Sequence, residues 1–344
     1  IASLRWKPAD WECVDGDSGI GLNDYFHVQG SDPAGAVRNG APKFRVEDTG
    51  PLVATVVIES DASGCNRLVR RVRVIDGLNR VEIEDILDKK EIPLEDLLKD
   101  EPAKEGFHLG FAFNVPDPEV RIDTPLAVVR PEKDQLEGAC KNWFSVQRFV
   151  DVSGKDCGVT WVSLDAPIVS LGAIARQPES THSLNGWLES IEPSATLFAF
   201  VMNNYWTTNY QHDQPGPKMF RFAITPHGKY DPVAAARFGR EQTQPLLLLP
   251  VDPQTVPMRP LIEEVPSGLV VTTLKPAYEG DAVIVRLLHL GAEPVEIDCA
   301  WLKPLGNRLW VSDLGEEAKT RLEGPITIPP GGIETIRIEP GEGF

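Results

Sequence analysis

The chain has 344 residues, of which 42% are hydrophobic, with 30 prolines and 29 glycines. Lys and Arg number 34 against 51 Asp and Glu, and the resulting net charge of −17 opposes binding to phosphate backbones and to anionic lipid. These numbers exclude a disordered chain and a nucleic-acid partner. The length exceeds what one core usually supports, which predicts two domains, and the turn-rich composition predicts an all-β fold.

The longest aliphatic run, PLLLLPV at 245–251, is far shorter than the ~20 residues of a membrane helix, so we expect no membrane partner. The first residues lack an initiator methionine and a signal-peptide pattern, so we expect that Ile1 follows an internal cut. The five cysteines form no CxxC pair, and we expect reduced, mostly buried thiols. The compartment stays open, with a soluble, cytoplasmic protein as the expectation.

Strands are predicted early in the chain. Residues 53–60 are rich in β-branched side chains, and 70–76 alternate arginine with valine or isoleucine as a half-buried strand does. The pattern resumes at 80–86 after an Asp-Gly-Leu-Asn turn, which predicts a hairpin. Residues 92–106 place leucines at helical spacing before a proline, which predicts a surface insertion with at most two helical turns.

Short strand candidates follow one another over 107–230 without helices between them, which predicts a sandwich rather than a βαβ sheet. One or two helical turns are predicted at 232–239. Six prolines between 242 and 266 favour an extended connection, and at least five strand candidates follow it. We therefore predict a large β-sandwich over 1–240, a proline-rich connection over 241–262 and a smaller C-terminal β-sandwich over 263–344.

Two segments, 202–217 and 129–148, combine aromatic rings with amides and carboxylates. Rings can cover the C–H faces of sugars while amides and carboxylates bind hydroxyl groups, so we predict a carbohydrate-facing surface. Polar loops that pack back on the sheet explain both segments as well. The candidate carbohydrate-facing residues are Asn203, Asn204, Tyr205, Trp206, Asn209, Tyr210, His212, Asp213, Asp134, Gln135, Asn142 and Trp143.

The sequence contains no self-contained catalytic constellation. Its six histidines form no HxxxH, HxH or HxD pair, and neither GxSxG nor a glycine-rich phosphate loop occurs. Glycosidases need two carboxylates across the scissile bond, but with 51 acidic residues the sequence nominates no pair. We therefore name no catalytic residue, no metal ligand and no cofactor for this chain.

Several long segments, taken in order, resemble the C-terminal β region of glycoside hydrolase family 38, the retaining α-mannosidases. The segments are DWECVDGDSGIGLNDYFHVQGSDP, VRVIDGLNRVEIEDILDKKE, RPEKDQLEGACKNWFSVQRFVDVS, GVTWVSLDAPIV, VMNNYWTTNYQHDQPGP, PHGKYDPVAAARFGREQTQPL and VVTTLKPAYEGDAVIVRLLHL. The resemblance implies a galactose-mutarotase-like large sandwich. It also implies that an upstream α/β barrel and a helical bundle of the same polypeptide carry a zinc ion and the catalytic carboxylates, for which this chain shows no counterpart.

By this resemblance the chain is the non-catalytic β region of a zinc-dependent retaining α-mannosidase, acting as scaffold and as part of a wall facing mannosides. Trp206 would be a ring platform, with Asn203, Asn204 and Asn209 as hydroxyl partners. A free-standing carbohydrate-binding module stays open as an alternative, and so does a mutarotase-like sugar epimerase. The epimerase would need a histidine acid and a glutamate base, and His108 is the nearest candidate, although it lies in a pattern typical of a core strand.

Overall fold

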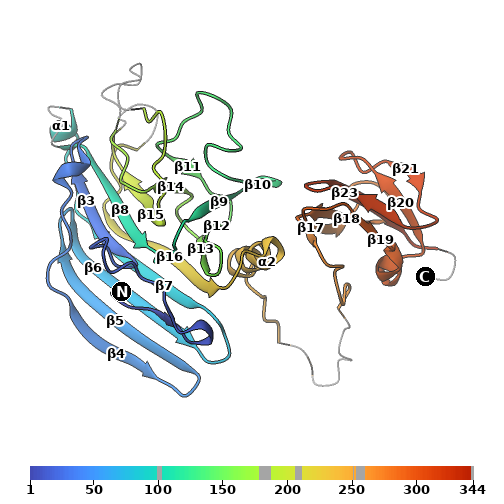
Figure 1. Ribbon diagram of the computed structural model, residues 1–344, viewed down its shortest axis with the longest axis horizontal. Coiled ribbons are helices and arrows are strands. Elements are labelled where there is room, and N and C mark those ends of the chain that lie inside the picture. The colour runs from blue at the N-terminus through green and yellow to red at the C-terminus, as the bar shows by residue number, and fades with distance from the viewer. Residues whose placement is uncertain (99–102, 178–186, 206–210, 251, 253–259, 342–344) are drawn as a thin grey trace. The chain divides into compact units, whose positions relative to one another are not determined.

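A computed structural model describes residues 1–98, 103–177, 187–205, 211–250, 252 and 260–341. The chain divides into two compact units, Ile1–Tyr230 and Asp231–Phe344 (Figure 1). Strands dominate both units, so the predicted all-β fold class is confirmed. In the part of the chain that the structure describes, no helix is long and apolar enough to cross a membrane.

The first unit is a sandwich of a nine-stranded and a five-stranded sheet, both antiparallel. The nine-stranded sheet contains, in spatial order, β10 (Ala127–Val129), β9 (Glu119–Thr124), β12 (Phe149–Ser153), β13 (Gly158–Ser163), β16 (Gly216–His227), β7 (Val81–Lys89), β6 (Cys65–Ile75), β5 (Val53–Ala62) and β4 (Lys43–Thr49). The five-stranded sheet contains β11 (Phe144–Ser145), β14 (Ile168–Leu171), β15 (Thr196–Asn203), β8 (Glu105–Ala112) and β3 (Asp24–Gln29). A small sheet pairs β1 (Arg5–Trp6) with β2 (Trp11–Glu12).

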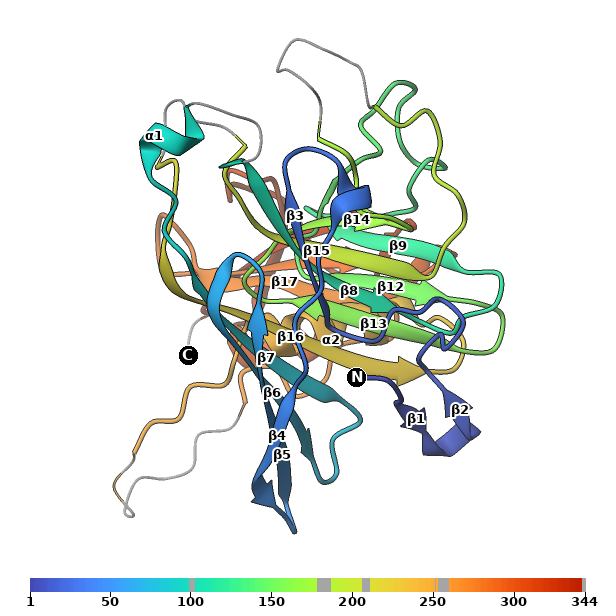
Figure 2. The same cartoon turned by 90° about the vertical axis from the view of Figure 1, so that its left-hand side faces the viewer.

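The hydrophobic core of this unit lies between the two sheets. In Figure 2 the five-stranded sheet lies over β9, β12 and β13, while β4 and β5 extend beyond it. Every residue of β4 is exposed. β7 alternates buried and partly exposed side chains because only one of its faces meets the core. At the centre, the ring of Trp161 packs edge-on against Phe111 and stacks on Phe222, with centroids 5.4 and 5.5 Å away.

Two hairpins build the middle of the nine-stranded sheet. The predicted hairpin is confirmed, since β6 and β7 pair antiparallel with Val74 opposite Val81. β5 and β6 are joined by a two-residue turn that ends at Gly64, which has a left-handed φ of +77°. A Cβ on Gly64 would lie 2.7 Å from the ring of Phe107, so both the backbone and the packing require glycine.

Two α-helices interrupt the strands. The single turn α1 (Leu94–Leu97) lies in the predicted insertion, and its length agrees with the prediction of at most two turns. The helix α2 (Pro232–Thr243) is longer than the predicted one or two turns at 232–239. Asp231 caps its first N–H groups, a proline occupies its first turn, and the good helix formers near its end extend it to Thr243.

The second unit contains a five-stranded antiparallel sheet and a two-stranded one. The larger sheet contains β17 (Leu269–Pro276), β18 (Val283–His289), β23 (Ile333–Glu339), β20 (Arg308–Ser312) and β21 (Ala318–Arg321), and the smaller one pairs β19 (Val295–Ile297) with β22 (Ile326–Ile328). At least five strands were predicted here, which is confirmed. β19 ends at Ile297, because Asp298 caps a 3-10 helix, Cys299–Leu305, by accepting the N–H of Ala300.

Candidate functional site

The structure divides the first predicted surface, 202–217, between solvent and interior. Asn203 ends β15 and is exposed, Tyr205 and His212 are partly buried, and Asn204 and Asp213 are buried. The hydroxyl group of Tyr205 donates to the carbonyl oxygen of Gly30 at 2.9 Å. The predicted residues Trp206, Asn209 and Tyr210 lie outside the described residues.

Asp213 belongs to a buried charge cluster with His27, Lys89 and Glu105, none of which is more than 6% exposed. The ammonium Nζ of Lys89 lies 2.7 Å from Oε1 of Glu105 and 2.5 Å from Oδ1 of Asp213. Neither of these oxygens accepts a well-directed hydrogen bond within the described residues, so the contacts are charge pairs. His27 completes the cluster, with Nε2 2.6 Å from Oε2 of Glu105.

Asn204 and Asp213 tie the ends of the segment between them to the ends of the insertion that contains α1. The side-chain oxygen of Asn204 accepts the N–H of Glu105 at 2.6 Å, and its amide nitrogen donates to the carbonyl of Ala103 at 3.2 Å. Oδ2 of Asp213 accepts the N–H of Ile92 at 2.8 Å. These two predicted residues therefore bind protein backbone, and their burial leaves no surface for a sugar hydroxyl.

The energetics of the cluster follow from its burial. An ionised group taken out of water is costly unless an opposite charge lies beside it, and here one ammonium lies between two carboxylates. Lys89 and Glu105 stand at the end of β7 and the start of β8, so the charge pair joins the two sheets of the sandwich. The arrangement positions the chain and does not offer an open reaction centre.

The second predicted surface, 129–148, begins with a loop held by its own side chains. The guanidinium of Arg130 donates to both oxygens of Asp134, at 3.0 and 2.9 Å. These bonds, the backbone N–H of Arg130 and its charge lower the pKa of Asp134 to about 2. Gln135 accepts the N–H of Glu132 at 2.9 Å and donates to a backbone carbonyl. Asp134 and Gln135 thus shape the loop.

Asn142 and Trp143 stand just before β11. Asn142 is 1% exposed, and its side-chain oxygen accepts the N–H of Leu188 at 3.0 Å. Trp143 is partly buried, and its indole N–H has no hydrogen-bond partner in the part of the chain that the structure describes. Asn142 therefore presents no amide to solvent, and Trp143 is only partly accessible.

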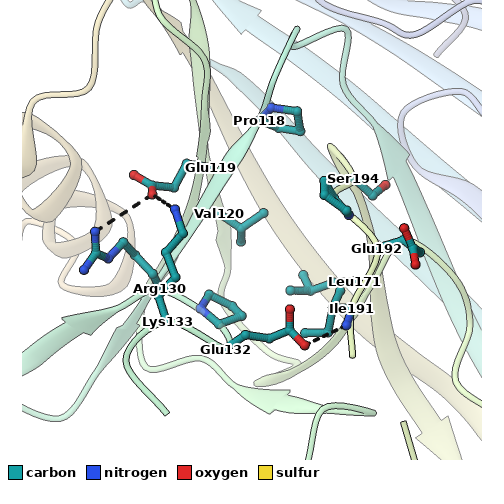
Figure 3. A pocket seen from close by; sticks show the side chains of 12 residues that line it. Pro118, Glu119, Val120, Arg130, Glu132, Lys133, Leu171, Ile191, Glu192 and Ser194 are labelled. Carbon is teal, nitrogen blue, oxygen red and sulfur yellow. Dashed lines mark hydrogen bonds and ion pairs between the residues drawn. The ribbon is translucent and has the colours of Figure 1, made fainter. Parts of the chain in front are cut away.

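An open pocket of about 200 Å³ lies beside this loop (Figure 3). Its lining consists of Pro118, Glu119, Val120, Arg130, Pro131, Glu132, Lys133, Leu171, Ile191, Glu192, Pro193 and Ser194. Neighbouring groups bind the charged side chains on its rim. Lys133 donates to Glu119 at 2.5 Å, and Glu132 accepts the backbone N–H of Ile191 at 2.8 Å. No aromatic ring lines it, and it is smaller than typical ligand pockets of roughly 300–1,000 Å³.

Within the described residues, the pocket lies at the opposite end of β15 from Asn203. β15 runs from Thr196 to Asn203, and Leu171 of the pocket pairs with Leu197 near its start. Asn203 lies at the other end of the same strand, about 20 Å away at roughly 3.3 Å per residue. A single sugar unit cannot contact both.

Two further polar groups bear on chemistry. His108 is 1% exposed and its ring stacks on Phe200 at 4.5 Å, as expected in a core strand. Burial lowers the pKa of His108 to about 3, so the ring is neutral near pH 7 and does not suit the acid of an epimerase. Ser153 and His227 both contact the carboxylate of Asp151, so the serine proton goes to the carboxylate and no Ser-His-Asp triad is formed.

The remaining groups with possible chemistry are the cysteines and the potential metal ligands. The five cysteines form no disulfide, as expected, and burial raises the pKa of Cys13 to about 12 and that of Cys299 to about 11. Within the described residues no three His, Cys, Asp or Glu side chains gather where they could hold a metal. The zinc implied by the resemblance therefore finds no ligand set among them.

Neither a protein-family model nor a curated protein matches the sequence. The solved structures that share the fold include two from Enterococcus faecalis. An alpha-mannosidase from Enterococcus faecalis V583 matches with a TM-score of 0.71 at 14% identity, over 98% of this chain and 40% of its own. A protein of glycosyl hydrolase family 38 from Enterococcus faecalis matches with a TM-score of 0.69 at 13% identity, over 98% of this chain and 42% of its own.

The chain therefore has the fold of a part of these family 38 structures and spans about 40% of their length. A galactose mutarotase related enzyme from Lactobacillus acidophilus reaches a TM-score of only 0.32, which adds nothing to that statement.

Proposed function

We propose that the chain is the C-terminal, non-catalytic β region of a zinc-dependent retaining α-mannosidase. It would act as scaffold for an upstream α/β barrel and helical bundle, and as part of the wall that faces mannosides. The observation that carries the proposal is the match over 98% of this chain to about 40% of an alpha-mannosidase structure. The remainder of such an enzyme supplies the metal and the carboxylates.

The structure supports a scaffold role through the buried charge cluster. Lys89, Glu105 and Asp213 fix the base of the segment that contains the predicted ring platform, and they do so with groups that solvent does not reach.

An activity assay tests the catalytic part of the proposal. The 344-residue chain, incubated with zinc and an aryl α-mannoside, should show no turnover above a no-protein control. Turnover that a chelator abolishes would place a complete active site inside these residues and refute the proposal.

Two further measurements test the finer statements. Calorimetry with mannobiose should show weak or no binding to the isolated chain, whereas tight binding that Trp206→Ala removes would favour a free-standing module. Limited proteolysis should cut first within 241–262 and release two resistant fragments, as expected if a large sandwich, a connection and a small sandwich follow one another. Cuts spread through the sandwiches would contradict that division.

A further inference from the structure

The chain leaves the first unit through an exit segment, residues 227–230. β16 ends at His227, and α2 begins at Pro232. Two side chains hold the segment against the nine-stranded sheet: the ring of Tyr230 lies 4.1 Å from the guanidinium carbon of Arg121, and His227 contacts Asp151. These two contacts fix the last residues of the first unit, where the chain leaves the sandwich.

Asp151 is a fully buried carboxylate with three hydrogen-bonding neighbours. Its Oδ2 lies 2.8 Å from Nε2 of His227 and accepts the hydroxyl of Thr160 at 2.8 Å, while Oδ1 accepts the hydroxyl of Ser153. β12, β13 and β16, which carry these groups, are adjacent in the sheet. The position of the histidine ring also depends on Gly158, because a Cβ there would lie 2.6 Å from its Cε1.

Both ring nitrogens of His227 face acceptors. Nε2 faces the carboxylate of Asp151 at 2.8 Å, and Nδ1 faces the carbonyl oxygen of Gly228 at 3.0 Å. A neutral imidazole carries one N–H, so only the protonated ring donates to both. When the proton leaves, one nitrogen turns a lone pair toward an oxygen and one of the two bonds is lost.

We propose that His227 is a proton-operated latch on the exit segment. The protonated ring links the carbonyl oxygen of Gly228 to the carboxylate of Asp151 in β12, and deprotonation breaks one of these two bonds and loosens the exit segment. The partly exposed ring, at 23% for its side chain, can exchange its proton with solvent, whereas its acceptor is sealed from it.

The groups around His227 favour its protonated form. Burial has the largest effect and lowers the pKa of His227, but the hydrogen bond and charge of Asp151, together with the backbone of Gly228 and Lys229, outweigh it and raise the pKa above 6.5. The stabilisation is therefore complete below about pH 6.5 and is lost as the pH rises through the raised pKa. A rise in pH therefore releases the latch.

Other charged groups nearby do not take the place of Asp151. On β9, Glu119 and Arg121 pair with each other. In the turn between β12 and β13, Lys155 and Asp156 are exposed. The side chain of Lys229 is exposed.

Trypsin provides the test, since it cuts after Lys229 inside the exit segment. The rate of this cut is compared between the wild-type chain and His227→Gln at several pH values, and the ratio removes the pH dependence of trypsin itself. At pH 6.5 the wild type should be cut at least tenfold more slowly than the variant, and at pH 9 the two rates should agree within twofold. Cutting after the exposed Lys133 should show no such change in ratio.

Nitrogen-15 spectra of the histidine rings in the wild type give a second, independent readout that requires no variant. Both ring nitrogens of His227 should be protonated at pH 6, and the ring should titrate above pH 6.5. A cleavage ratio that does not change with pH, or a ring that titrates at or below 6.5, overturns the proposal. If His227→Gln does not fold, the ring titration alone decides.

Discussion

Replacing Lys89 with methionine tests whether the buried charge cluster holds the two sheets of the first unit together. The methionine keeps most of the side-chain volume but removes the ammonium that lies 2.7 Å from Glu105 and 2.5 Å from Asp213. Two carboxylates then remain in the interior without their shared cation. Breaking a buried pair in this way costs about 3–5 kcal/mol, because the charge that stays behind is not compensated.

The structure places the expected value at the lower end of that range. Glu105 keeps its contact with His27 at 2.6 Å, and Asp213 keeps the N–H of Ile92 at 2.8 Å. A loss of about 3 kcal/mol in the free energy of unfolding is therefore expected for Lys89→Met. For a unit of this size, 1 kcal/mol shifts the midpoint by about 2–4 °C, so the thermal midpoint should fall by about 6–12 °C.

Urea and thermal unfolding of the chain at pH 7, followed by tryptophan fluorescence, measure the effect. Lys133→Met serves as the control, because Lys133 is 60% exposed in its ion pair with Glu119 and such pairs are worth about 0–1 kcal/mol. Adding Asp213→Asn to Lys89→Met should recover at least about 1 kcal/mol by removing one uncompensated charge. If Lys89→Met costs less than 1 kcal/mol, the cluster does not hold the sheets together and the reasoning fails.

Three further changes probe the same unit. Gly64→Ala should cost about 2–4 kcal/mol, because its Cβ would meet Phe107 at 2.7 Å, whereas Gly138→Ala, with the same φ of +77° and open space, should cost only about 1 kcal/mol in urea unfolding. Trp161→Ala should cost about 3–5 kcal/mol by opening a cavity, and a similar loss in the 40% exposed Trp187→Ala would contradict this reasoning. Burial raises the pKa of Asp85 to about 6, so the folded state holds its proton more tightly and, relative to Asp85→Asn, wild-type stability should fall by about 2 kcal/mol between pH 4 and 7. A constant difference between these two proteins across that pH range would disprove the assignment.

The sequence predicted the strands whose two faces differ. Residues 81–84 alternate apolar and charged side chains, and the structure shows buried and partly exposed positions alternating from 81 to 89. β3 was not predicted because it is buried on both faces: Tyr25 points to the core while Phe26 packs against Phe198 on the other side. Without a solvated face a short strand carries no alternation, and its polar His27 resembles loop sequence.

The candidate site was harder to predict because polarity does not reveal a partner. Asn204 and Asp213 stand in a polar segment that fits a ligand surface, yet one binds the backbone of Glu105 and the other the ammonium of Lys89. The partners are far apart in sequence, and only the pairing of Gly216 with Lys89 in the sheet brings Asp213 beside it. Composition alone cannot supply that register.

One signal for this cluster was nevertheless present. Along 81–89 the odd-numbered positions face the core, and two of them carry charges, Asp85 and Lys89. A charge at a core-facing position of an alternating strand requires a buried partner of opposite charge, since an unpaired ion is too costly there. The structure shows both partners, Arg70 beside Asp85 and two carboxylates beside Lys89. A charge that breaks the alternation therefore indicates where distant segments meet.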